Sequence, residues 1–133
     1  MRQTPLLTFT SSAFAVVPGE DEYTNPGIYG QALAQWIAER LRARGLDAGD
    51  AFAEDFGWCV PVRQPPHVIH VACAGDEDRE FGWQVFCFVE DGLLARIRRR
   101  GESAEALARV FGELKDTLAA APEVKDLGEE RDA

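Results

Sequence analysis

The sequence lacks long apolar runs and has few cysteines. No stretch approaches the ~20 consecutive apolar residues of a transmembrane helix, and the first residues lack the apolar segment of a secretion signal, so we expect a cytoplasmic protein without membrane contact. The three cysteines, Cys59, Cys73 and Cys87, lie in apolar, strand-like runs. An odd number of cysteines in such surroundings is typical of reduced, buried thiols rather than of a disulfide framework.

Basic side chains are also in short supply. The chain has 14 Lys and Arg against 23 Asp and Glu, which gives a formal net charge of -9. Proteins that bind double-stranded nucleic acid or anionic membranes without sequence preference present a net basic surface. The charge balance therefore argues against both kinds of partner.

Signatures of catalysis and of cofactor binding are missing as well. Residues 25–30 (NPGIYG) lack the spacing and the lysine of a phosphate loop, and their glycines favour close packing of a helix on a sheet. His67, His70 and Cys73 are zinc-ligand residue types, but a spacing of three along a strand alternates between its faces. We predict no catalytic residue, no metal site and no cofactor.

What is present is the composition of a globular protein. The 133 residues are 46% hydrophobic and 28% charged, which suits one soluble domain. We predict a single α+β domain over residues 1–121, followed by a flexible acidic tail over residues 122–133.

Apolar periodicity predicts two helices and four to five strands. The first helix is expected to begin at Asn25 and Pro26 and to end at Gly45, and the second to run from near Ser103 to Pro122. Strands are expected over residues 6–10, 56–62, 67–74, 81–89 and 93–99, and residues 13–17 either continue the first strand or form a hairpin with it. This β-α-β-β-β-β-α order predicts an antiparallel sheet with both helices packed on one face.

The hairpin register then decides which side chains the helices cover. Asp91-Gly92 is a strong two-residue turn signal that pairs residues 81–89 with 93–99. With a turn over residues 76–79, the helices are expected to cover Ile69, Val71, Phe86, Phe88 and Ile97. The opposite face is expected to carry an apolar floor of Trp83, Val85, Cys87 and Val89. Its predicted binding residues are Trp83, His70, Arg96, Arg98 and Arg100. Alternatively, these arginines only shield an exposed sheet edge.

A second candidate site is a pocket between the sheet and the first helix, lined by Tyr29, Glu54, Asp55 and Trp58. Adjacent carboxylates such as Glu54 and Asp55 can bind a cation or share a proton. However, neighbouring residues on a strand point to opposite faces, and a solvated loop is the simpler explanation of the pair.

Two motifs carry a resemblance to known sequences. Residues 25–36 fit the pattern N-P-x-x-Y-G-x-x-L-A-x-W, and residues 54–58 fit E-D-aromatic-G-W. Together they resemble motifs of small bacterial proteins whose function is unknown. The resemblance implies a bacterial, cytoplasmic setting and brings no activity, ligand or catalytic residue with it.

These observations favour a non-enzymatic binding domain that contacts a protein partner or a second copy of itself. One specific version is a toxin-neutralising immunity protein, because a small acidic chain can block a basic active site. The alternative is a small enzyme or a small-ligand-binding protein that uses the pocket at Tyr29. Residues 45–95 carry ten acidic and two basic side chains, whereas residues 96–100 carry four arginines. If the protein binds an anionic ligand, we therefore expect it to do so only at residues 96–100.

Overall fold

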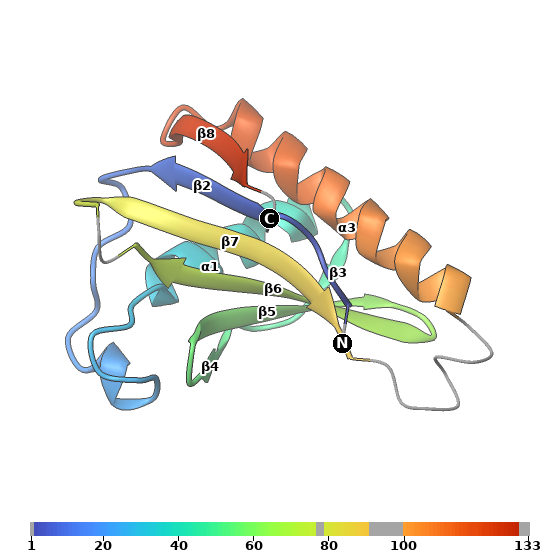
Figure 1. The fold of residues 1–133 in the computed structure, drawn as a ribbon, viewed down its shortest axis with the longest axis horizontal. Coiled ribbons are helices and arrows are strands. Elements are labelled where there is room, and N and C mark those ends of the chain that lie inside the picture. The colour runs from blue at the N-terminus through green and yellow to red at the C-terminus, as the bar shows by residue number, and fades with distance from the viewer. Residues whose placement is uncertain (1, 77–78, 91–99, 131–133) are drawn as a thin grey trace.

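A computed structural model describes residues 2–76, 79–90 and 100–130. It is an α+β fold with an antiparallel sheet and two α-helices (Figure 1). Its elements are β1 (Arg2–Gln3), β2 (Leu6–Thr10), the short 3-10 helix η1 (Glu20–Glu22), α1 (Gln31–Ala43), β3 (Asp47–Ala48), β4 (Phe52–Glu54), β5 (Gly57–Gln64), β6 (His67–Gly75), β7 (Gly82–Val89), α3 (Arg100–Ala120) and β8 (Lys125–Glu130).

Within the described residues the sheet has eight strands, more than the four to five predicted. Six of them follow the order β3-β5-β6-β7-β2-β8, while β1 pairs with β7 and β4 pairs with β5. The strands that the sequence did not indicate are β1, β3, β4 and β8. Residues 13–17, predicted as a continuation of the first strand or its hairpin partner, are irregular.

Two predictions about the chain after β7 need correction. Both edges of β7 are occupied, because Val85 pairs with Cys73 on β6 and with Leu7 on β2. The predicted pairing of residues 81–89 with 93–99 is therefore wrong, although residues 91–99 themselves lie outside the described ranges. Arg100, predicted to face Trp83 across that hairpin, is the first residue of α3.

The predicted assignment of faces is also wrong. In the structure Gly75 pairs with Trp83 and Val71 with Cys87, because the connection from β6 to β7 is longer than the expected turn at residues 76–79. A turn at 76–79 would place Gly75 opposite Glu80, and a shift of three residues exchanges the two faces of a strand. Trp83, Val85, Cys87 and Val89 consequently lie in the helix-covered core with Ile69 and Val71, whereas Phe86 and Phe88 lie outside it.

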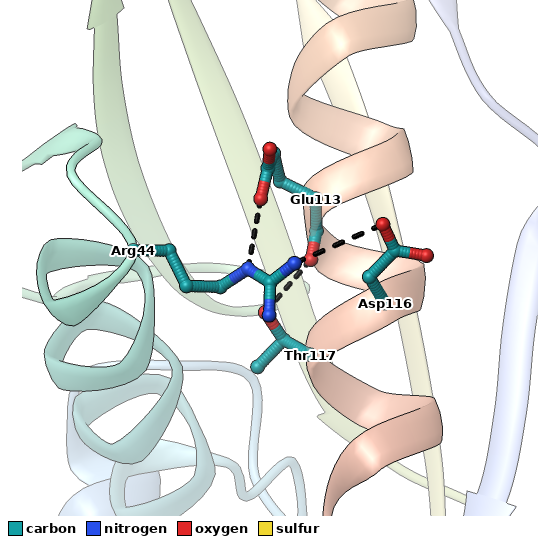
Figure 2. A network of polar contacts seen from close by, with 4 residues as sticks. All are labelled: Arg44, Glu113, Asp116 and Thr117. Atoms are coloured by element: carbon teal, nitrogen blue, oxygen red, sulfur yellow. Dashed lines mark hydrogen bonds and ion pairs between the residues drawn. The ribbon is translucent and has the colours of Figure 1, made fainter.

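Both helices pack on the same face of the sheet. The main core joins Leu33, Ile37 and Leu41 of α1 and Leu107, Val110, Leu114 and Leu118 of α3 to the alternate residues of β2, β5, β6 and β7. At the C-terminal end of α1, Arg44 connects the two helices: its Nε lies 2.8 Å from Oε2 of Glu113, and its Nη2 lies 3.8 Å from Oδ2 of Asp116 (Figure 2). Neither helix of the described ranges has the length and apolar character that a membrane span needs.

The start of α1 differs from the prediction. The helix begins at Gln31, and Asn25 is part of a preceding turn in which the Ile28 N–H donates to the Asn25 carbonyl. The N-terminal amides are satisfied by Glu20, whose Oε1 accepts hydrogen bonds from the Gly30 and Gln31 N–H groups at 2.7 and 3.0 Å. The cap therefore comes from a residue outside the expected motif.

The C-terminal segment is partly a strand. Residues 122–133 were predicted to be a flexible acidic tail, but β8 pairs antiparallel with β2 over Leu6–Thr10. Its residues are mostly exposed, so β8 is joined to the sheet chiefly by its backbone.

Candidate functional site

The face of the sheet opposite α1 and α3, here called the open face, carries a group of aromatic rings. Strand alternation places His70 on β6, Phe86 and Phe88 on β7, and Phe52 on β4 on this face. Phe56, in the turn between β4 and β5, also reaches it. We call these five residues, Phe52, Phe56, His70, Phe86 and Phe88, the aromatic platform. Because both helices pack elsewhere, the platform has no helical cover within the described ranges.

The rings form one connected network around Phe88. Phe88 stacks on His70 with ring centroids 5.0 Å apart and lies 6.1 Å from Phe56 and 6.0 Å from Phe86. Phe52 contacts the far side of the network, edge to face with His70 at 5.9 Å. Phe56 remains 45% exposed, which is unusual for a large apolar side chain in contact with other rings.

Beside these rings lies a hollow of about 320 Å³. It is lined by the five platform residues together with Glu54 and Glu90, and both of these glutamates are exposed. A smaller hollow of about 230 Å³ lies on the same face beyond Phe56 and is lined by Leu6, Phe56, Ala72, Cys73, Ala74, Gln84 and Phe86. Phe56 borders both cavities.

The larger hollow combines apolar ring surfaces with negative charge. Neither lysine nor arginine is among the described residues that line it, and its acidic groups are the carboxylates of Glu54 and Glu90. The Nδ1 atom of His70 is buried and has no hydrogen-bond partner among the described residues. Aromatic faces and carboxylates both attract organic cations. The hollow is therefore suited to a cation with an apolar body.

The two predicted sites each contribute one residue to this hollow. His70 comes from the predicted Trp83 surface and Glu54 from the predicted Tyr29 pocket. Trp83 is only 6% exposed, in the core, and its Nε1 donates to the Ser11 carbonyl at 3.1 Å. Arg96 and Arg98 lie outside the described residues, and of Arg100 only its position at the start of α3 is described.

The other residues of the predicted pocket are separated. Trp58 is 7% exposed in the helix-covered core, and Asp55 is exposed in the β4–β5 turn. Tyr29 lines a different cavity of about 820 Å³, which also includes Asp76, Arg79 and Trp83 but not Glu54. In that cavity Arg79 is already engaged, with Nη2 donating to the Phe9 carbonyl and Nε 3.9 Å from Oδ2 of Asp76.

Reasoning from the sequence missed Phe52, Phe56, Phe86, Phe88 and Glu90. Phe86 and Phe88 were assigned to the buried face by the wrong register. Phe52 belongs to a three-residue strand that has no recognisable pattern. The available signal was the alternation of Phe86 and Phe88 with Val85, Cys87 and Val89, which indicates two apolar faces without saying which one the helices cover.

The thiols do not offer nucleophilic chemistry. Cys59 is fully buried beneath the platform, and burial, with a smaller contribution from the charge of Glu54, raises its pKa to about 12. Burial also raises the pKa values of Cys73 and Cys87. Thiolates are the reactive form, so these side chains are inert near neutral pH. No group of three or more His, Cys, Asp or Glu residues within the described ranges is arranged to hold a metal ion.

Comparison with protein families, with curated proteins and with solved structures finds no match for this chain.

Proposed function

We propose that this protein is a binding protein without catalytic activity that docks a basic partner protein on its open face. The observation that carries the proposal is the platform: five rings joined by contacts into one network, on a sheet face without helical cover in the described ranges. Aromatic side chains dominate the energetics of protein interfaces. The net charge of -9 and the carboxylates of Glu54 and Glu90 favour a basic partner.

A toxin-neutralising immunity protein is one version of this function. In that version the acidic open face covers a basic active site and stands in for an anionic substrate. Such a role needs a surface that binds tightly and does no chemistry of its own. The buried, protonated thiols are in keeping with it.

Site-specific photocrosslinking in the natural host tests the proposal. A photoreactive phenylalanine analogue is placed at Phe56 and, in a separate variant, at Phe81, which is 57% exposed and lies outside the platform. We expect an adduct with a basic protein from position 56 and none with that protein from position 81. Adducts from position 81 alone, or between two copies of this chain, would overturn the basic partner.

The captured protein must then bind the purified chain in a platform-dependent manner. Removing a central aromatic contact costs on the order of 2 kcal/mol, so Phe56→Ser should raise Kd by roughly thirtyfold. Phe81→Ser, a substitution of a more exposed ring outside the platform, should leave Kd unchanged. Equal effects of the two substitutions in a calorimetric titration would remove the platform from the interface.

A further inference from the structure

The walls of the hollow present ring surfaces from several directions. Phe88 is nearly parallel to His70, with 19° between the planes, and is inclined by 70° to Phe56. Phe52 is inclined by 84° to His70. Rings set at such angles around one cavity offer π faces on more than one side, which is how aromatic side chains enclose an organic cation.

The charges of the hollow come from different elements. Glu54 ends β4, which pairs with β5, and Glu90 directly follows β7, which is separated from β5 by β6. The carboxylates therefore flank the rings from two sides. The field of Glu54 reaches the floor of the open face, since it contributes to the raised pKa of Cys59. A cation lying on the rings is attracted from both sides.

The chemistry of the walls distinguishes between the two basic side chains. A lysine ammonium is compact and strongly hydrated, so removing its water in an apolar hollow is costly. An arginine guanidinium is planar and weakly hydrated, stacks on aromatic faces and forms paired hydrogen bonds with a carboxylate. The volume of about 320 Å³ is at the lower end of the range for ligand pockets, which suits one long side chain better than a large cofactor.

We infer that the hollow is an arginine receptor, in which a partner's guanidinium stacks on an aromatic ring of the hollow beside His70 and pairs with Glu54 or Glu90. The inference rests on the proposed function, since it names the side chain by which the basic partner is anchored. An anchor of this kind fills a concave, apolar site at the centre of an interface, where single side chains contribute most to affinity.

The chain offers a direct readout, because it contains only two histidines. His70 lines the hollow, whereas His67 is 9% exposed, lies outside the hollow and serves as an internal reference. The probes are three blocked tripeptides: acetyl-Gly-Arg-Gly-amide, the lysine equivalent, and the citrulline equivalent, which keeps the shape of arginine without its charge. Imidazole C–H resonances are followed by proton NMR during titration.

We expect the arginine peptide to move the His70 resonances to saturation and to leave those of His67 in place. Its affinity should exceed that of the citrulline peptide by roughly tenfold and also exceed that of the lysine peptide. Glu54→Gln and Glu90→Gln should each weaken arginine binding, and together they should abolish the advantage over citrulline. Glu39→Gln, at an exposed carboxylate on α1 outside the hollow, is the matched control and should change nothing.

Several results would overturn the arginine receptor. These are equal binding of arginine and citrulline, tighter binding of lysine, equal movement of both histidines, or no movement of His70. The proposed docking function can fail independently of the arginine receptor, and the two experiments together distinguish the cases. A partner crosslinked at Phe56 without arginine binding would refute only the anchor, whereas arginine binding with no partner at Phe56 would refute the docking function.

Discussion

At the residue scale, the backbone carbonyl of Cys73 explains why positions 30 and 57 are glycines. A Cβ atom on Gly30 would lie 2.9 Å from the Cys73 carbonyl oxygen, and a Cβ on Gly57 would overlap the same oxygen. Gly30 precedes α1 and Gly57 begins β5, so both elements approach β6 at this point. The predicted close packing of a glycine against the sheet is confirmed for Gly30, but Gly27 has open space around it.

Gly57→Ala should therefore destabilise the protein by roughly 4 kcal/mol, since the new methyl group can be accommodated only if the β5–β6 pairing shifts. Gly45→Ala is the control: Gly45 also has a positive φ, +90°, but nothing lies within 4 Å of its Cβ position. That variant should lose about 1–2 kcal/mol from backbone strain alone. Urea unfolding followed by circular dichroism measures both, and similar losses would mean that the overlap is relieved without cost.

The candidate site shows how far single residues can be interpreted from the sequence. His70 and Glu54 were recognised as binding residues, but they were assigned to different sites. Their shared hollow depends on the β6–β7 register and on β4, a strand of three residues. Neither feature has a recognisable signal in the sequence. In particular, the six-residue connection between β6 and β7 and the expected four-residue turn would both appear as polar loops.

At the element scale, α1 depends on a carboxylate that is distant in sequence. Glu20 is 2% exposed, and besides the two amides at the start of α1 its Oε2 accepts a hydrogen bond from the Val17 N–H at 2.6 Å. This one side chain therefore joins the loop before η1 to the helix. A carboxylate at a helix N-terminus is also favoured by the helix dipole.

Glu20→Ala should lower the free energy of unfolding by about 3 kcal/mol, because it leaves three backbone donors without their charged acceptor. Glu20→Gln, which keeps the size and one acceptor oxygen, should lose less. Glu22→Ala, two residues away at an exposed position, should have little effect. Chemical denaturation monitored by tryptophan fluorescence gives the three values. Equal losses for Glu20→Ala and Glu22→Ala would show that other groups satisfy the start of α1.

The elements that could be predicted are those whose apolar residues recur at the spacing of a helix or a strand. The cores of β2, β5, β6 and β7 and most of both helices follow from the spacing of their apolar residues. By contrast, β8 has a single large apolar residue, Leu127, which is 37% exposed. An edge strand held by its backbone needs no alternating pattern, so nothing in residues 125–130 distinguished it from a polar tail.

At the scale of the whole molecule, the one-sided packing of the helices creates the open face. Two helices of 13 and 21 residues cover one side of the sheet. The other side keeps its own small apolar cluster of Cys59, Ala72 and Phe88 with Phe52 and Phe86 against it. An antiparallel sheet can keep one face toward water if that face is polar. Here it is aromatic, which favours a partner.

The three buried thiols give the whole molecule a defined response to alkaline pH. Burial raises the pKa of Cys59 from 9.0 to about 12, so the folded protein keeps this thiol protonated while the unfolded chain loses the proton. The raised value contributes stability that is fully present below about pH 9 and lost as pH rises towards 12. Each such thiol should reduce the unfolding free energy by about 1.4 kcal/mol per pH unit within this window.

Cys59→Ala removes one of these contributions. Between about pH 9 and 11 the unfolding free energy of this variant should therefore decline less steeply than that of the parent protein, by about 1.4 kcal/mol per pH unit. Because the two proteins differ only at residue 59, parallel curves in urea unfolding would show that Cys59 ionises in the folded state.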